Sequence, residues 1–158
     1  MNIVVVGVGY VGLITGLGLS HLNHNVQFLD IDSKKIKKLN DRESPFYEPR
    51  LDEYLNDENI TKNVTFTDNY DEIFWDNVDV IMICVQTPSL ETHEVDTSFL
   101  NKVFESIQGR FNKDSVICIK STIHPEALAN VIKSTTFSED SLVFNPEFLR
   151  EGTAFSDF

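Results

Sequence analysis

Residues 4–12 read Val4-Val5-Val6-Gly7-Val8-Gly9-Tyr10-Val11-Gly12. The apolar run 3–6 that leads into the first glycine is too short for a buried helix, and its β-branched residues suit a strand covered on both faces. A helical pattern of apolar residues follows the glycines, and a second apolar strand at 26–29 stops at Asp30. A strand, a glycine turn, a helix and a strand that ends in a carboxylate are the arrangement of a dinucleotide-binding unit.

Each glycine of this stretch has a physical task. Gly7 permits a tight turn, Gly9 lets the backbone approach a pyrophosphate, and Gly12 lets the helix lie close to the strand. No lysine is needed there, because the free N–H groups and the dipole at a helix start already favour an anion. The alternative is a glycine-rich turn in an ordinary α/β protein. The second strand and its terminal acid favour the nucleotide site.

The carboxylate of Asp30 lies 18 residues past Gly12, near the spacing expected for an acid that holds the adenosine ribose hydroxyls. An acid at this position repels a 2′-phosphate, so we predict NAD as cofactor rather than NADP. Asp32 either shares this role or caps the helix that follows, and capping is the favoured interpretation. Ser33 is another candidate cap. Lys35 belongs either to a solvated face of four lysines or to the adenosine end of the cofactor site.

Composition excludes several classes of protein. The 158 residues suffice for one domain with a substantial core, and the net charge of −12 argues against nucleic acid or anionic membranes as partners. Cys84 and Cys118 fall in apolar, strand-like runs, so we expect buried thiols in a reducing compartment, with neither a disulfide nor a metal site. No apolar run reaches the length of a membrane span, and the first residues lack the basic leader of a signal peptide. We therefore expect a cytoplasmic protein.

The rest of the chain alternates strands with helices. Strands are predicted at 64–67, 78–85, 116–119 and 142–144, and helices near 33–39, 51–55, 70–75, 99–107 and 125–132. This alternation predicts an α/β fold of the Rossmann type, a doubly wound and mainly parallel sheet with helices on both faces. Polar residues follow the predicted strands at Asp30, Thr87, Thr122 and Glu147. The carboxyl ends of parallel strands share one edge, and ligands bind there.

Further motifs extend along the whole chain. They are Gly7-x-Gly9-Tyr10-Val11-Gly12-Leu13, Asp30-x-Asp32, Tyr47-Glu48-Pro49, Cys84-Val85-x-Thr87-Pro88, Lys120-Ser121-Thr122 and Asn145-Pro146-Glu147-Phe148-Leu149-Arg150-Glu151-Gly152. On these motifs the chain resembles the NAD-binding domain of the UDP-glucose/GDP-mannose dehydrogenases, which oxidise nucleotide sugars to uronic acids with two NAD. Members that act on UDP-glucose are nearest, although those using other UDP-sugars share most motifs. The last motif is the most specific, because a generic dinucleotide fold has no reason to carry it.

The resemblance implies roles for individual residues. The implied cofactor-binding residues are Gly7, Val8, Gly9, Tyr10, Val11, Gly12, Asp30, Lys35, Thr87, Thr122 and Glu151. The implied substrate-binding residues are Glu147, Phe148, Leu149, Arg150 and Glu151. Glu147 would be the catalytic acid/base, acting directly or through water, and Thr122 would help to orient a water or the reacting sugar oxygen.

Hydride transfer from an alcohol needs a proton acceptor near the hydroxyl, and a carboxylate beside the cofactor supplies one. From the residues alone, a second interpretation is equally open. Glu147 and Glu151 would then be a first-turn acid that helps a helix to start and a surface partner for Arg150. His124, in a turn beside a proline, is more often incidental than catalytic.

Two residues depart from the pattern of the family, which has glycine where this chain has Gln86 and Glu126. Gln86 would crowd the backbone beside the nicotinamide ribose, while Glu126 would either weaken cofactor binding or suit a helix N-terminus. The family's nucleophilic cysteine, its central helix and its nucleotide-sugar domain have no counterpart in residues 1–158.

We therefore expect residues 1–158 to be a single NAD-binding domain of a UDP-sugar dehydrogenase, which binds NAD with little turnover by itself. The full-length proteins of the family are expected to be homodimers. The alternative, motivated by Gln86 and Glu126, is a stand-alone NAD-binding regulatory module. A dehydrogenase of the β-hydroxyacid type is disfavoured by the motif at 145–152.

Overall fold

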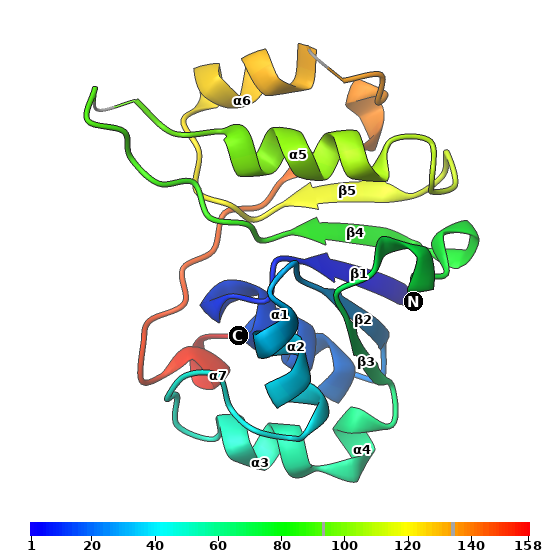
Figure 1. The fold of residues 1–158 in the computed structure, drawn as a ribbon, viewed down its shortest axis with the longest axis vertical. Coiled ribbons are helices and arrows are strands. Elements are labelled where there is room, and N and C mark those ends of the chain that lie inside the picture. Colours follow the sequence, from blue (N-terminus) through cyan, green and yellow to red (C-terminus); the bar gives the residue numbers. More distant parts are fainter. Residues whose placement is uncertain (93, 134) are drawn as a thin grey trace.

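The computed structural model describes residues 1–92, 94–133 and 135–158. At its centre is a 6-stranded sheet in the order β3-β2-β1-β4-β5-β6, and every neighbouring pair is parallel (Figure 1). The strands are β1 (Asn2–Val6), β2 (Asn25–Leu29), β3 (Val64–Thr67), β4 (Val80–Ile83), β5 (Val116–Ile119) and β6 (Leu142–Phe144). This strand order is that of the doubly wound dinucleotide-binding folds. The predicted fold class is confirmed.

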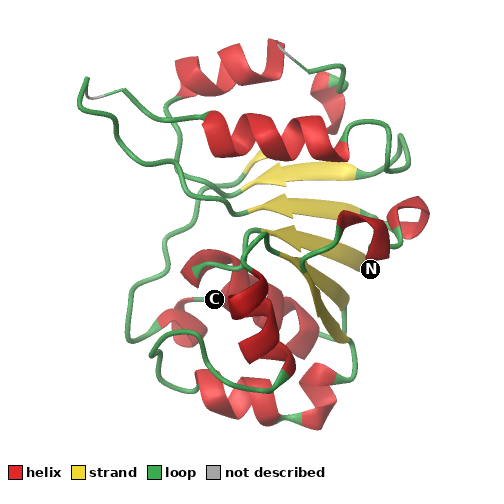
Figure 2. Ribbon diagram, viewed as in Figure 1, coloured by secondary structure: helices red, strands yellow, loops and turns green. Residues whose placement is uncertain are grey.

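Helices cover both faces of the sheet (Figure 2). They are α1 (Tyr10–His21), α2 (Ser33–Asn40), α3 (Leu51–Asn56), α4 (Glu58–Thr61), α5 (Ser98–Ile107), α6 (Pro125–Lys133) and α7 (Ala154–Asp157). The described residues also include three 3₁₀ turns, η1 (Tyr70–Glu72), η2 (Trp75–Asn77) and η3 (Glu139–Ser141). The sequence pattern missed α4 and α7, because each spans only four residues and shows no helical period.

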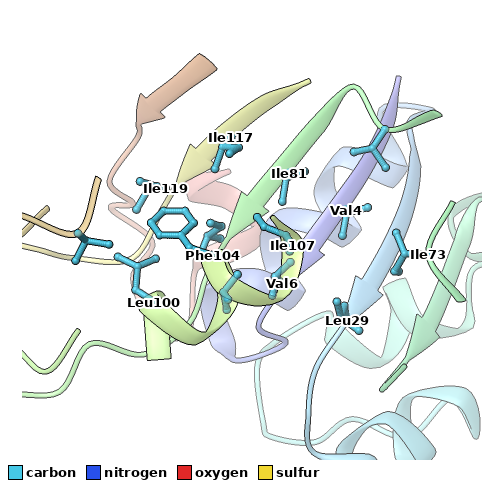
Figure 3. Packing of buried hydrophobic residues seen from close by; sticks show 14 of the residues in the cluster. Val4, Val6, Leu29, Ile73, Ile81, Leu100, Phe104, Ile107, Ile117 and Ile119 are labelled. Carbon is cyan, nitrogen blue, oxygen red and sulfur yellow. The ribbon is translucent and has the colours of Figure 1, made fainter. Parts of the chain in front are cut away.

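The core consists of two layers divided by the sheet. Val4 and Val6 point to the layer closed by α5, in which Leu100, Phe104 and Ile107 pack against the central strands (Figure 3). Ile3 and Val5 point to the opposite layer, which α1, α2, α3 and α4 close. Because alternate residues of β1 are buried on opposite faces, residues 3–6 of the strand are all apolar, as the sequence predicts.

Three local predictions were wrong. The predicted helix at 70–75 is instead the two 3₁₀ turns η1 and η2, because the Phe74 amide donates to the Gln27 side chain of β2 at 3.1 Å rather than to an α-helical carbonyl. Strand β4 is shorter than 78–85 and ends before Cys84. Ser33 is the first residue of α2 rather than its cap, since the Asp32 side chain accepts hydrogen bonds from the amides at 34 and 35.

The segment after β6 positions the site. All strands point their carboxyl ends to one edge of the sheet, and residues 145–153 run along that edge from β6 to α7, the red element of Figure 1. This path carries the Asn145–Gly152 motif from the α5 and α6 side of the molecule to the first turn of α1. Within the described ranges, no helix is long and apolar enough to cross a membrane.

Candidate functional site

A cavity of about 680 Å³ lies at the carboxyl ends of the strands, around the paired β1 and β4, between which the strand order reverses. In open parallel sheets this reversal of strand order is where ligands bind. The predicted site residues that line it are Gly7, Gly9, Tyr10, Val11, Asp30, Lys35, Thr87, Thr122 and Glu147. Tertiary folding therefore brings together residues from loops after five of the strands.

Six predicted residues lie outside the cavity lining. They are Val8, Gly12, Phe148, Leu149, Arg150 and Glu151. Val8 and Gly12 are buried behind the glycine turn, whereas Phe148 and Arg150 are exposed. The charge of Glu151 is among the causes that raise the pKa of Tyr10, after burial of the phenol and the effects of Glu48, so Glu151 lies near the turn.

The glycines of the turn differ in their surroundings. Gly7 has φ +94°, and a β-carbon there would lie 2.9 Å from the backbone of Cys84. A β-carbon on Gly12 would come within 2.0 Å of the Gly7 carbonyl oxygen. Gly9 instead has no atom within 4 Å of its β-carbon position, and it opens into the cavity. Two of these glycines permit close packing, and the third leaves space for a ligand.

The start of α1 has no side-chain cap, as a helix start that binds an anion would require. Gly9 is the N-cap of this 12-residue helix, and no side chain caps the first turn. The amides of a helix start point out of the helix and carry its positive partial charge. An open glycine beside these amides fits the pyrophosphate of a dinucleotide.

The Asp30 carboxylate stands at the end of β2, on the rim of the cavity. Its Oδ2 accepts hydrogen bonds from the Val8 amide at 2.6 Å and from Lys35 Nζ at 2.8 Å, and its Oδ1 accepts from the Asp32 amide at 2.9 Å. Lys35 is thus drawn to the cavity and away from the solvated face of α2. The Asp32 carboxylate caps α2, and the Lys35 amide is the main cause that lowers its pKa.

The opposite end of the cavity is built from the loops after β4 and β5. Thr87 Oγ1 donates to the Thr122 carbonyl at 2.5 Å, and Ser121 Oγ donates to the Val85 carbonyl at 2.6 Å. These bonds hold the two loops together across the mouth of the cavity. Glu147 enters from the segment after β6, where its Oε2 accepts the Leu149 amide at 2.6 Å.

The two departures from the family pattern occupy different places. Gln86 lines the cavity with an exposed side chain. Glu126 is exposed in the first turn of α6 and outside the cavity lining, where an acid suits the helix dipole. His124 Nδ1 accepts the Glu126 amide at 3.3 Å, so its imidazole serves the helix start.

The match with a family of known proteins extends over the whole chain. Residues 1–158 match the model of the UDP-glucose/GDP-mannose dehydrogenase family, NAD binding domain. The chain belongs to this family. As a domain of that family, it takes NAD as its cofactor.

Individual relatives agree with this assignment. The chain is 43% identical to UDP-glucose 6-dehydrogenase of Rickettsia felis over 161 residues, which cover 100% of this chain and 36% of the relative. The corresponding enzyme of Rickettsia prowazekii is 44% identical, with 100% of this chain and 37% of the relative covered. The chain therefore spans little more than a third of the length of these relatives.

Solved structures show the same fold. A ternary complex of GDP-mannose dehydrogenase from Pseudomonas aeruginosa superposes with a TM-score of 0.86 at 30% identity. The superposition covers 99% of this chain and 38% of that one.

Sequence reasoning missed part of the cavity wall of this NAD-binding domain. The lining residues for which no site role was predicted include Tyr70, Phe99, Lys102, Ser106 and Lys120. Phe99, Lys102 and Ser106 recur at helical spacing along α5, which was available as a signal. Lys120 directly follows β5, is only 9% exposed, and donates to Asn145 Oδ1 at 3.1 Å. The position of Lys120 directly after a predicted strand could have indicated that it lies at the edge of the sheet where ligands bind.

Neither thiol of the domain is suited to nucleophilic chemistry. Burial raises the pKa of Cys84 to about 12, although the cavity reaches this residue. Burial likewise raises the pKa of Cys118. A thiol attacks as the thiolate, and the surroundings of both cysteines disfavour that form. Within the described ranges, no group of three or more acidic, histidine or cysteine side chains could hold a metal ion.

Proposed function

We propose that this domain binds NAD for the oxidation of a nucleotide sugar, UDP-glucose or a related UDP-sugar, to the uronic acid. The observation that carries the proposal is that Glu147 opens into the same cavity as the glycine turn and Asp30. A single cavity then holds an anion site, a ribose-binding acid and a candidate proton acceptor. The identity to relatives named UDP-glucose 6-dehydrogenase supports this substrate class.

Separate groups of residues are proposed to bind the separate parts of the cofactor. When bound, NAD accepts the hydride that leaves the alcohol carbon. The amides at the start of α1 hold the pyrophosphate, and Asp30 accepts the adenosine ribose hydroxyls. Thr87 and Thr122 flank the nicotinamide half, and Thr122 orients a water or the reacting sugar oxygen.

Glu147 takes the proton of the alcohol, directly or through a water. The Leu149 amide that donates to Glu147 holds this carboxylate in place. Leu149, Arg150 and the exposed Phe148 and Glu151 lie next along the chain and are proposed to contact the sugar nucleotide. A complete oxidation to the acid uses two NAD, and the second step needs a nucleophile that neither Cys84 nor Cys118 provides.

The test compares cofactors and then removes the proton acceptor. Titration calorimetry of the 158-residue chain should show NAD binding and at least ~10-fold weaker binding of NADP, because Asp30 repels the 2′-phosphate. Glu147→Gln should keep the NAD affinity, since the amide has nearly the shape of the carboxylate. In the gene product that contains this domain, the same variant should lose at least ~100-fold in kcat. A preference for NADP, or full turnover by Glu147→Gln, would overturn the proposal.

A stand-alone NAD-binding regulatory module is the second candidate. The observation that favours it is the Gln86 side chain in the cavity lining, where the family has glycine. NAD binding without UDP-sugar turnover in the complete gene product, and with no effect of Glu147→Gln, would favour this module over the enzyme.

A further inference from the structure

A buried carboxylate outside the cavity lining connects two parts of the site. Glu48 is 5% exposed and lies in the connector between α2 and α3. Its Oε2 accepts hydrogen bonds from Tyr10 Oη and from the Gly152 amide, both at 2.8 Å. Its Oε1 accepts the Ala154 amide at 3.0 Å. Both oxygens are therefore used, with three donors from two distant segments.

The two segments have different tasks. Tyr10 is the first residue of α1, directly after the open Gly9, and it lines the cavity. Gly152 and Ala154 follow the Glu147–Glu151 stretch that carries the proposed proton acceptor. Tyr10 Oη also lies 3.2 Å from the Arg150 carbonyl oxygen, within the same segment. Glu48 thus stands between the anion site and the substrate segment, and contacts both.

The charge of Glu48 is retained in this position. Burial opposes ionisation, but the Gly152 amide and the Tyr10 hydroxyl together lower the pKa of Glu48 below its usual value. Burial of the phenol, and after it the hydrogen bond to Glu48, raises the pKa of Tyr10, so the tyrosine stays a donor at any physiological pH. An ionised carboxylate makes hydrogen bonds about twice as strong as those of a neutral acceptor.

We propose that Glu48 is a positioning residue, which couples the first turn of α1 to the substrate segment so that NAD binding orders residues 147–154. The coupling follows from geometry. If NAD holds the first turn of α1 in place, the Tyr10 hydroxyl stays on Glu48, and Glu48 in turn holds the amides of Gly152 and Ala154. The proposal rests on the function proposed above only in naming 147–151 as the substrate segment.

The chemistry of the site suggests suitable variants. Tyr10→Phe removes one hydroxyl and leaves the ring, which packs 5.4 Å from the Phe46 ring between centroids. Glu48→Gln replaces one acceptor oxygen by an NH₂ group, which must face at least one donor. Ser115→Ala is the matched control, because it also removes one buried hydroxyl, which donates to the Val78 carbonyl at the opposite edge of the sheet.

The first measurement is amide hydrogen exchange at Gly152 and Ala154, in the 158-residue chain without and with saturating NAD. Without NAD, Glu48→Gln should accelerate exchange at these two amides by roughly 2- to 12-fold, the worth of one hydrogen bond. In Ser115→Ala, both amides should exchange at the same rate as in the unmodified chain. Unchanged exchange in Glu48→Gln would overturn the proposal, and this arm needs no cofactor.

The second measurement separates coupling from a purely structural role. NAD should slow exchange at Gly152 and Ala154 in the unmodified chain and in Ser115→Ala, but not in Tyr10→Phe, even where Tyr10→Phe is saturated with NAD. If Tyr10→Phe keeps the NAD-dependent slowing, the coupling is refuted. Tyr10→Phe decides the question even if Glu48→Gln does not fold.

A double-mutant cycle completes the test. If Glu48 acts on NAD through Tyr10, the double variant should bind NAD no more weakly than Glu48→Gln alone, within about twofold. If the fold-loss in NAD affinity of the double variant equals the product of the losses of the two single variants, the two residues act independently, and the coupling is refuted. Failure of the unmodified chain to bind NAD would instead count against the proposed function, and the exchange data without cofactor would still decide the role of Glu48.

Discussion

The Val8 amide donates to Asp30 Oδ2 at 2.6 Å and so joins the glycine turn to the end of β2. The same oxygen accepts Lys35 Nζ at 2.8 Å. One carboxylate therefore connects three elements at this end of the cavity, and the ribose of NAD, proposed to bind there, would have to share it with groups already present.

Asp30→Ala should weaken NAD binding by about 1.5–3 kcal/mol, the worth of a hydrogen bond to a charged group. The substitution should also reduce the difference in affinity between NAD and NADP, because Lys35 would then meet the 2′-phosphate without a neighbouring acid. Titration calorimetry with both nucleotides measures both effects. Asp41→Ala is the control, since Asp41 pairs with Lys37 on the exposed side of α2, outside the cavity lining. Unchanged NAD affinity in Asp30→Ala would refute the role of Asp30.

Substitution of Gly12 should lower the stability of the fold, whereas substitution of Gly9 should lower NAD binding and leave the stability unchanged. Gly12→Ala would place a β-carbon 2.0 Å from the Gly7 carbonyl oxygen and should destabilise the fold by about 1–3 kcal/mol or more, as overpacking does. Gly9→Ala meets no atom within 4 Å at φ −80°, so thermal unfolding should be unchanged or slightly higher. NAD binding by Gly9→Ala should nevertheless fall, because the new methyl group occupies the phosphate space. Normal NAD binding by Gly9→Ala would contradict the proposed anion site.

The domain should lose stability in acid through two carboxylates that hold its C-terminal end. Hydrogen bonds from Arg150 hold the pKa of Asp157 well below its usual range, and the pKa of Glu48 is lowered too. A group with a lowered folded pKa stabilises the fold above its unfolded pKa, and this contribution is lost as pH falls through the folded value. The free energy of unfolding should therefore be level near neutral pH and decline below about pH 5.

Urea unfolding at a series of pH values tests this dependence. Asp157→Asn should flatten the acid decline, because the amide no longer titrates. Asp76→Asn serves for comparison, as an exposed aspartate at the opposite edge of the sheet. An acid decline as steep in Asp157→Asn as in the unmodified chain would show that other groups cause it.

The cysteines should be protected in the folded chain. With the pKa of Cys84 raised to about 12, almost none of this thiol is ionised at pH 8, and labelling by Ellman's reagent should be more than ~100-fold slower than in urea. Cys118→Ser assigns the remaining signal to Cys84. Rapid stoichiometric labelling of the folded Cys118→Ser variant would contradict the protonated state of the half-buried Cys84 thiol.

Local features were predictable because their causes are local. The strands at 26–29, 64–67, 116–119 and 142–144 follow from short runs rich in β-branched and aromatic residues, which favour the extended backbone of a sheet. The two 3₁₀ turns at 70–72 and 75–77, in place of the predicted helix, were not predictable, because the amide of Phe74 donates to the side chain of Gln27, 47 residues earlier. The spacing of apolar residues within 70–75 gives no information about a hydrogen-bond partner so far away in the sequence.

The candidate site, like the fold, was predictable where the cause is local. Asp30, Thr87, Thr122 and Glu147 each follow a strand, and the parallel order of the sheet is enough to bring such positions to one edge. The helical spacing of the α5 residues places them on one face of that helix, but whether this face reaches the cavity depends on how closely α5 approaches the edge, which is decided by tertiary packing.

The sequence by itself determined the doubly wound fold, the glycine turn and the acid at the end of β2, because burial on both faces and backbone sterics act within a few residues. Only the tertiary structure decided what Glu48 does, since its partners lie 38, 104 and 106 residues away. A carboxylate among apolar and aromatic neighbours is stable only where donors reach it. In this chain those donors come together only once the segment after β6 has run along the edge of the sheet to α1.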